Sequence, residues 1–346
     1  MTGVWTQGLA ARLHAQAPED GDWMAALLAD RGPDGQGNLG DLPFPGSGST
    51  LHRWQALAAV AHFDLALAKL YEGHTDALAI MAELGEPIAS RGEGSWGVWA
   101  SEAPGGKTFF EAISSDEVRL YGTKFWCSGA ATADNALLTA WAADGSGPQL
   151  FRLALDQPGI HVDANAWKAV GMVGSASLDV AFDGARAHRV GKPGDYLSRP
   201  GFWQGGAGVA ACWYGGARGI AQTLHNAVIA APPTGRTPFR LAALGKIDLA
   251  LHSTVCVLRE AAAWIDAQPK ADASQVALTC RLAAEQCARQ VLDEAGCALG
   301  AGAFCRDAKF ARAAADLPVF IRQSHAEHDF AALGERTAEA LQPWAL

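Results

Sequence analysis

The chain has 346 residues, enough for two or three structural units around a large buried core. Hydrophobic residues make up 49% and charged residues only 18%, so we expect another subunit to cover part of the surface. The net charge of -9 and the lack of a long basic run argue against a nucleic acid or an anionic membrane as partner.

In most of the first quarter of the chain, apolar residues recur at the spacing of an α-helix. Residues 1–30 predict short helical segments, and their candidates for the buried face are Leu9, Leu13, Trp23, Leu27 and Leu28. Residues 31–50 hold six glycines and three prolines and predict a loop. Residues 51–84 predict two helices that break at 72–75, with Thr75 as N-cap. His74 lies beside this break and is expected to cap the loop rather than to catalyse.

Near residue 91 the pattern changes to short alternating runs separated by Gly, Asp and Pro. These runs predict a small antiparallel barrel or sandwich whose strand signal ends near 182–184; they are 117–121, 136–142, 149–154, 160–163 and 178–182. Residues 121–130, between two of these runs, predict a β-hairpin loop that faces a ligand. Trp126 suits stacking on a planar cofactor and Ser128 bonding to its edge, although a buried Trp at a strand end fits equally well.

From residue 206 onward, long Ala- and Leu-rich runs with short polar links predict a four-helix bundle; the runs are 207–230, 238–267, 273–298 and 306–338. The predicted fold is therefore α+β in three parts. A helical domain occupies 1–92, a β-domain occupies 93–192, and a helical bundle occupies 193–346.

The seven cysteines form no CxxC pair and lie mostly in apolar, helix-like sequence, at positions 127, 212, 256, 280, 287, 297 and 305. Free Cys in such sequence behaves as a small hydrophobe, so we expect a reducing compartment and no structural metal. The first residues lack a basic and then apolar signal, and no stretch approaches 18 uninterrupted apolar residues. These features predict a cytoplasmic protein without a membrane partner.

The order of the parts, together with three motifs, resembles the acyl-CoA dehydrogenase family of flavoproteins. The first motif is Trp99-Ala-Ser-Glu-Ala-Pro-Gly-Gly106, which is similar to the family's Thr-Glu-Pro-x-x-Gly-Ser turn. The second is Thr123-Lys-Phe-Trp-Cys-Ser-Gly-Ala130, similar to Lys-x-Trp-Ile-Thr-Asn-Gly. The third is Gly171-Met-Val-Gly-Ser-Ala-Ser177, similar to Gly-Met-x-x-Ser-x-Ser. The resemblance implies FAD as cofactor and flavin contacts from Ser101, Trp126, Cys127 and Ser128.

The resemblance extends into the bundle. Arg236-Thr-Pro-Phe239 is similar to an Arg-x-x-Phe-Gly segment whose Arg, from a neighbouring subunit, grips the FAD pyrophosphate while the Phe packs near the cofactor. Leu299-Gly-Ala-Gly302 resembles a Gly-Gly-x-Gly loop, which implies that the backbone at Gly300 approaches FAD. Here Leu stands in place of the first glycine. The resemblance also implies a homodimer or homotetramer.

The family's catalytic Glu is missing. Counting from Arg306-Asp-Ala-Lys309 reaches 313–315, which are all Ala, and the alternative position within 205–212 also lacks an acid. The nearest acid–base candidates are His325 and Asp329, spaced to share one helix face. The same cluster reads equally as a solvated helix face or a subunit contact.

Three functions follow from these patterns. The first is α,β-oxidation of an acyl thioester or similar acyl substrate by an FAD-dependent dehydrogenase with a displaced base and an electron-acceptor protein. The second is a flavin-dependent monooxygenase on the same fold, which does not need the Glu and is served by a reductase. The third is a degenerate member that binds flavin or a partner without chemistry. Trp203, within a Gly-rich stretch, suits a pocket for a bulky or aromatic substrate.

Overall fold

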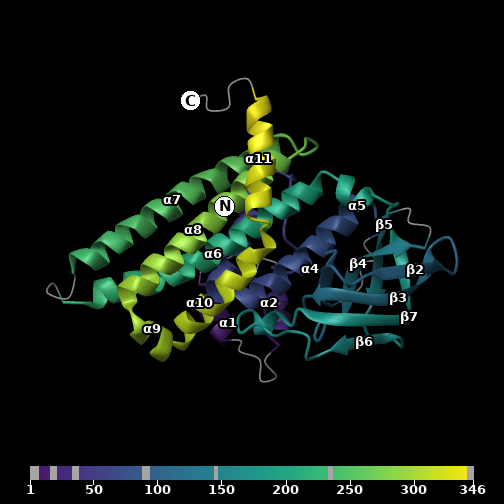
Figure 1. The fold of residues 1–346 in the computed structure, drawn as a ribbon, viewed down its shortest axis with the longest axis horizontal. Coiled ribbons are helices and arrows are strands. Elements are labelled where there is room, and N and C mark those ends of the chain that lie inside the picture. Colours follow the sequence, from purple (N-terminus) through teal and green to yellow (C-terminus); the bar gives the residue numbers. More distant parts are fainter. Residues whose placement is uncertain are drawn as a thin grey trace.

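The computed structural model describes residues 8–15, 22–32, 39–87, 94–143, 147–232 and 237–340. Helices precede and follow a β-domain, so the predicted α+β class and order are confirmed (Figure 1). The elements are α1 (Leu9–Ala15), α2 (Trp23–Ala29), α3 (Thr50–Phe63), α4 (Leu65–Glu83), β1 (Trp96–Trp99), β2 (Thr108–Ala112), β3 (Glu117–Cys127), β4 (Asn135–Ala142), β5 (Pro148–Ala154), β6 (Ile160–Asp163), β7 (Leu178–Val190), α5 (Asp195–Ser198), α6 (Gly201–Ala230), α7 (Pro238–Ala267), α8 (Ser274–Leu299), α9 (Ala301–Arg306), α10 (Ala308–Phe320) and α11 (Glu327–Glu339).

The predicted break in the first long helical stretch is wrong. The chain breaks at Asp64, whose carboxylate accepts the backbone N–H of Leu67 at 2.8 Å and caps α4. Residues 72–75 continue inside α4. His74 is buried there, with Nε2 3.3 Å from the carbonyl oxygen of Gly40, and Thr75 bonds back to the helix at Glu72. Packing against the rest of the protein outweighs the low helix propensity of the glycine in this segment.

The β-domain is a small closed barrel. Its ring runs β4–β2–β3–β7–β5 and closes by the β4–β5 pairing, while β1 and β6 add to its edges. Most pairings are antiparallel, as expected, but β1 and β2 both run parallel to β4. Neither of these two strands was predicted, because glycines and a charged turn surround their few residues. The strand β7 also continues to Val190, beyond the expected end near 182–184.

The predicted hairpin at 121–130 is wrong as well. Strand β3 runs through most of that segment and pairs with β2 and β7, not with β4. Two irregularities, after Leu120 and after Lys124, bend it along the way. Gly122 makes this course possible, because it has φ +98° and a Cβ there would lie 2.3 Å from the carbonyl oxygen of Lys107.

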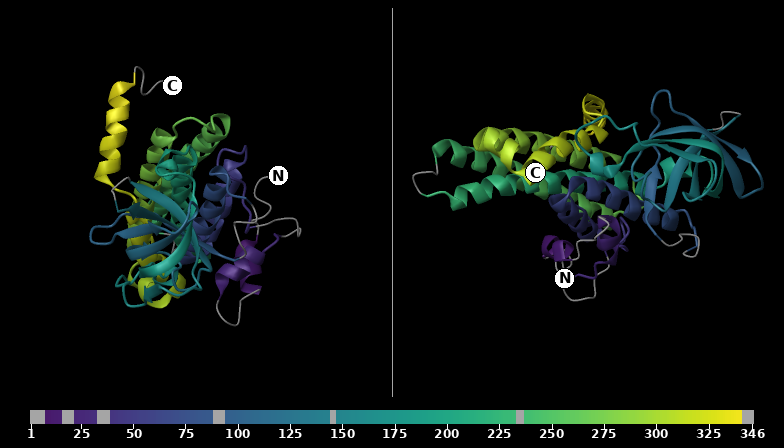
Figure 2. Two further views of the ribbon diagram at one scale, coloured as in Figure 1. Left: turned by 90° about the vertical axis from the view of Figure 1, so that its right-hand side faces the viewer. Right: turned by 90° about the horizontal axis from the view of Figure 1, so that it is seen from below.

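The long helices α6, α7 and α8 lie side by side, and α3 and α10 pack against α6 (Figures 1 and 2). The fourth predicted bundle helix, 306–338, is in fact divided into α10, a short 3-10 turn and α11, and its first residue is the last of α9. Ser324 and Asp329 accept backbone N–H groups of Ala326 and His325, and these local bonds replace helical ones at the break. Helix α11 then projects away from the bundle (Figure 1).

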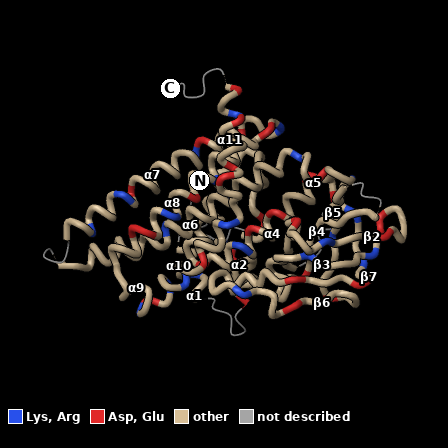
Figure 3. Tube along the Cα trace, viewed as in Figure 1, with Lys and Arg blue, Asp and Glu red and all other residues tan. Residues whose placement is uncertain are grey.

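One hydrophobic core spans helices from both ends of the chain, a second fills the barrel, and a third joins α4 to the barrel. Charged residues are sparse along the tube of α6, whereas α7 carries several (Figure 3). Helix α7 is long and apolar enough to cross a membrane by length and composition alone, yet it packs in the bundle against α6 and α8. Its outward face carries the exposed side chains of Phe239, Leu241 and Leu249.

Candidate active site

Trp126 is held outward at the end of β3. It lies in the irregularity between Lys124 and Cys127 and has φ +59°, a backbone conformation that non-glycine residues rarely adopt. The irregularity turns its indole out of the barrel, so that the side chain is 55% exposed. An exposed aromatic face kept in place by a strained backbone is typical of a binding position. The alternative of a buried Trp at a strand end is thereby excluded.

The two residues that follow differ from each other. Cys127 is buried in the barrel core, and its burial raises the pKa of its thiol, so only its backbone is available to a ligand. The Ser128 hydroxyl lies 2.8 Å from that of Ser177, which lies 2.9 Å from that of Ser175. Ser175 in turn donates to the carbonyl oxygen of Met172 at 2.8 Å. A chain of hydroxyl groups therefore joins the second and third sequence motifs.

The turn after β1 completes this end of the barrel. It packs on the residue before Trp126, since a Cβ at Gly106 would lie 2.8 Å from the ring of Phe125. Glu102 anchors the turn through Lys124 Nζ at 2.8 Å. Ser101 beside it is exposed. The structure thus brings together the three motifs that lie far apart in the sequence.

The loop before β7 meets helix α10 very closely. A Cβ at Gly171 would lie 2.0 Å from the carbonyl oxygen of Ala315, so any other residue would push α10 away. Val170 and Val173 on the same loop are 86% and 61% exposed. Both line the larger of two cavities in this region. Exposed valines at a cavity wall provide an apolar surface for a ligand.

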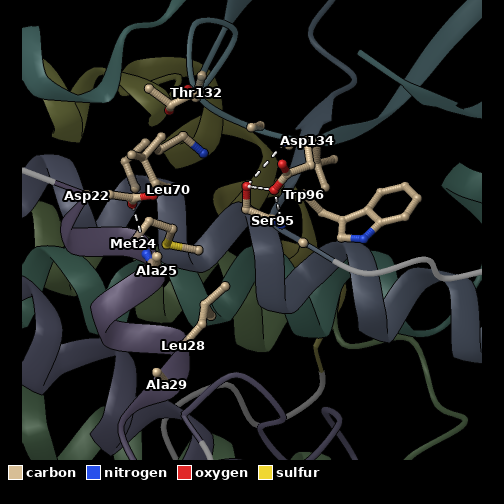
Figure 4. A pocket seen from close by; sticks show the side chains of 18 residues that line it. Asp22, Met24, Ala25, Leu28, Ala29, Leu70, Ser95, Trp96, Thr132 and Asp134 are labelled. Carbon is tan, nitrogen blue, oxygen red and sulfur yellow. Dashed lines mark hydrogen bonds between the residues drawn. The ribbon is translucent and has the colours of Figure 1, made fainter. Parts of the chain in front are cut away.

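The smaller cavity has a volume of about 430 Å³ and lies between α2, α4 and the start of β1. In Figure 4, Ser95 and Asp134 on the barrel side face Asp22, the N-cap of α2, and Met24 within α2. Asp134 accepts hydrogen bonds from the backbone and the hydroxyl of Ser95, at 2.7 and 2.9 Å. The hydroxyl-bearing Ser128 also lines this cavity. Both walls therefore combine polar and apolar side chains.

Lys69 of α4 also lines the smaller cavity, and it forms an ion pair with Glu72 at 2.6 Å. Burial lowers the pKa of Lys69, but the adjacent Glu72 outweighs this effect and the pKa is raised. The ammonium group therefore stays charged and is held by its partner.

The larger cavity has a volume of about 1050 Å³ and shares four lining residues with the smaller one, namely Asp22, Met24, Leu70 and Thr132. Its walls come from the α3–α4 junction, α6, α10 and the loop at 170–174. This volume is at the upper end for a small-molecule site. The walls are mainly apolar, with a few titratable side chains.

One of these side chains is Asp316, which the sequence analysis missed. It follows directly after Ala315, where the family resemblance expects a catalytic acid. Asp316 is only 5% exposed, and its Oδ1 accepts the backbone N–H of Met172 at 2.5 Å. Burial raises the pKa of this carboxyl group, while the hydrogen bond from Met172 opposes the rise. Allowing a shift of one position in the motif would have found it.

His62 is a second missed residue. It lies in the last turn of α3, and its ring lines the larger cavity. Burial, assisted by the positive charges of Arg218 and Lys309, lowers its pKa to about 4. The imidazole is therefore neutral near pH 7. No sequence pattern singled it out, because its environment comes from three separate helices.

The predicted catalytic pair lies elsewhere. His325 precedes α11, its side chain is 78% exposed, and its Nδ1 is 3.4 Å from Asp329 Oδ1. The two residues do meet, although through a helix break and not along one helix face. Neither lines either of the two cavities. Among the described residues, no group of three or more His, Cys, Asp or Glu side chains gathers to hold a metal.

The predicted cofactor residues of the bundle lie at its far end from the barrel. Phe239 begins α7 and is 85% exposed, and Gly300, with φ +68°, ends α8 (Figures 1 and 2). Arg236 lies outside the described residues. Within one chain, Phe239 and Gly300 are therefore separated from Trp126 by the length of the bundle. If both groups contact one cofactor, the second group comes from another copy.

A scan of the sequence against protein-family models finds no match, and neither does a search of curated proteins. Solved structures do match. TdsC from Paenibacillus sp. A11-2, a dibenzothiophene monooxygenase solved with FMN and indole, has a TM-score of 0.76 and 18% identity, over 96% of this chain and 95% of that chain.

Two further similar structures span nearly the whole chain. KijD3, solved with FMN and dTDP-3-amino-2,3,6-trideoxy-4-keto-3-methyl-D-glucose, has a TM-score of 0.74 and 18% identity, over 100% of this chain and 96% of that chain. The methanesulfinate monooxygenase MsuC from Pseudomonas fluorescens has a TM-score of 0.73 and 18% identity, over 97% and 94%. At these identities the likeness establishes the fold, which is the acyl-CoA dehydrogenase-like fold of flavin-dependent enzymes.

Proposed function

We propose that this protein is a flavin-dependent oxidoreductase, and within that class a monooxygenase that uses reduced FMN and oxygenates a small, largely apolar molecule. The observation that carries the proposal is the exposed Trp126 with the hydroxyl chain behind it. Ser128 of that chain lines the smaller cavity, which shares four lining residues with the cavity of about 1050 Å³. The two monooxygenases of the same fold support the choice by analogy.

The residues fit a flavin. The indole of Trp126 offers a flat face for an aromatic ring system, and its strained backbone holds that face outward. The hydroxyl of Ser128 and the backbone beside it can bond the polar edge of the ring. When bound in its reduced form, FMN supplies two electrons to molecular oxygen, so that one oxygen atom enters the substrate and the other leaves as water.

FMN is proposed in place of FAD, which the sequence resemblance implies. Binding of FAD needs a grip on the pyrophosphate and a close backbone approach near Gly300. The chain departs from the family pattern there, with Leu299 in place of a glycine. FMN ends at its first phosphate and does not require these contacts. The two described FMN complexes of the same fold agree with this choice.

The protein's own groups would position the substrate. Val170, Val173 and Leu70 give the larger cavity an apolar surface, and a bound ring would cover the exposed side chains of the two valines. A monooxygenase does not need to remove an α-proton from a thioester. The Ala at position 315 is therefore no obstacle to this reaction, whereas it removes the usual base of a dehydrogenase.

A dehydrogenase acting on an acyl thioester remains the second candidate, and Asp316 favours it. Its carboxyl lies one position from the expected acid, lines the larger cavity and has a raised pKa, as suits a general base. Against this reading, one carboxylate oxygen is already committed to the backbone of Met172. The same contact gives Asp316 a structural role in holding α10 to the loop at 170–174.

The two reactions are separated by one pair of measurements on purified protein. In the first, the protein is loaded with oxidised flavin and mixed anaerobically with a panel of acyl-CoAs. In the second, it receives reduced FMN, oxygen and an aromatic probe such as indole. We expect no bleaching in the first and an oxygenated product in the second. Bleaching of the flavin by an acyl-CoA without added reductant would refute the monooxygenase assignment.

Flavin placement is tested separately by titrating FMN and FAD into Trp126 variants. Replacing Trp126 by Ala is expected to weaken flavin binding roughly ten-fold, while Trp126→Phe keeps most of the affinity because a ring remains. The exposed Phe109 on the same barrel serves as a control, since Phe109→Ala should leave the affinity unchanged. Equal flavin affinity for wild type and Trp126→Ala would rule out this placement.

The partner we propose for the outward face of α7 is a second copy of the chain. That face carries exposed apolar side chains at Phe239, Leu241 and Leu249, together with the exposed charges of Lys246 and Asp248. A separate reductase is proposed as the source of reduced flavin. We propose that the assembly is cytoplasmic.

A further inference from the structure

The larger cavity contains one buried ring nitrogen that has no partner. Nδ1 of His62 is buried and forms no hydrogen bond with any residue in the described part of the chain. It faces α6 at Gly219, where an added Cβ would lie 3.7 Å from Nδ1 and 3.2 Å from the carbonyl oxygen of His62. Gly219 has no side chain that could offer Nδ1 a hydrogen bond. This leaves Nε2 as the nitrogen available to the cavity.

The surroundings of His62 fix the form of the ring. Burial and the positive charges of Arg218 and Lys309 hold the imidazole neutral, so it carries one proton. A proton on Nδ1 would be a buried donor with no acceptor. An unpaired lone pair on Nδ1 costs less free energy than an unpaired buried N–H, and the positive charges of Arg218 and Lys309 act on the ring. The proton therefore belongs on Nε2, which then points a donor into a mainly apolar cavity.

We propose that His62 orients the substrate by donating a hydrogen bond from Nε2 to a single acceptor atom on an uncharged, ring-sized substrate. The inference rests on the proposed function, because it takes the larger cavity as the substrate site. The apolar walls, which include Phe63 and Ile220, hold the body of such a molecule, and the His62 donor sets its direction. A molecule of the same shape that lacks the acceptor leaves the donor unpaired and binds more weakly.

The test uses two probes of equal shape, quinoline with an acceptor nitrogen and naphthalene without one. Binding to the full chain is measured without turnover, by calorimetry or by ligand-observed NMR. The wild type is expected to prefer quinoline by roughly three- to ten-fold after correction for the solubility of the two probes. His62→Phe keeps a ring and should lose the preference. His62→Gln should keep part of it, because the Gln amide nitrogen occupies nearly the place of Nε2, whereas His62→Asn should not.

The outcomes separate this inference from the proposed function. Flavin affinity is measured on the same variants and is expected to stay unchanged. If flavin binds but the quinoline preference is absent, or persists in His62→Phe, the role of His62 is refuted and the proposed function stands. If indole, which offers a donor, is preferred and that preference depends on His62, the donor assignment is overturned. If the wild type binds no flavin, the proposed function fails first.

Discussion

Replacing His62 by Gln should remove a measurable acid sensitivity from the protein. In the folded chain the pKa of His62 is lowered from 6.5 to about 4, chiefly by burial and then by Arg218 and Lys309. Above the unfolded pKa both states hold a neutral ring, and the stability is unaffected. As pH falls below 6.5, the unfolded chain gains a proton that the folded chain resists, so stability is lost until the folded pKa is passed.

The size of the effect follows from the shift. At about pH 5, which lies about 1.5 units below the unfolded pKa, the loss amounts to about 2 kcal/mol, and the partial exposure of the ring reduces it to about 1–2 kcal/mol. Wild type and His62→Gln are compared by urea unfolding at about pH 8 and about pH 5. The wild type is expected to lose more stability than the variant by this amount. An equal loss in both proteins, or an NMR titration of His62 near its ordinary pKa, would refute the assignment of a neutral buried ring.

Three further predictions concern packing and assembly. Gly171→Ala should destabilise the protein by about 1–3 kcal/mol in thermal unfolding, because its Cβ has no room against α10, and a neutral result would contradict the close approach. Asp316→Ala should cost about 1–3 kcal/mol by leaving the buried N–H of Met172 unpaired, whereas Asp316→Asn keeps an acceptor and should cost less; equal losses would argue against that bond. Leu249→Glu on α7 should lower the assembly mass seen by light scattering, whereas Leu197→Glu, an equally drastic change on α5, should not. An unchanged mass for both would remove α7 from the interface.

The sequence by itself determined the α+β class, the order of its parts and most of the strands. Hydrophobic periodicity and turn residues are local signals, and they survive wherever each element packs in the ordinary way. The sequence also singled out Trp126, because a Trp beside small polar residues is unusual in a strand. Where packing overrode local preference, prediction failed. Examples are Gly73, which lies inside α4 and not at a helix end, and the break before α11.

Only the tertiary structure decided which residues share a site. The hydroxyl chain from Ser128 to Ser175 joins segments almost fifty residues apart, and it depends on β3 pairing with β7 and not with β4. Asp316 and His62 acquired their character in the same way. Both are ordinary polar residues in the sequence, and only burial between distant helices changes their pKa values. The burial of a side chain and the charges around it depend on segments from the whole fold, so a local sequence pattern cannot predict them.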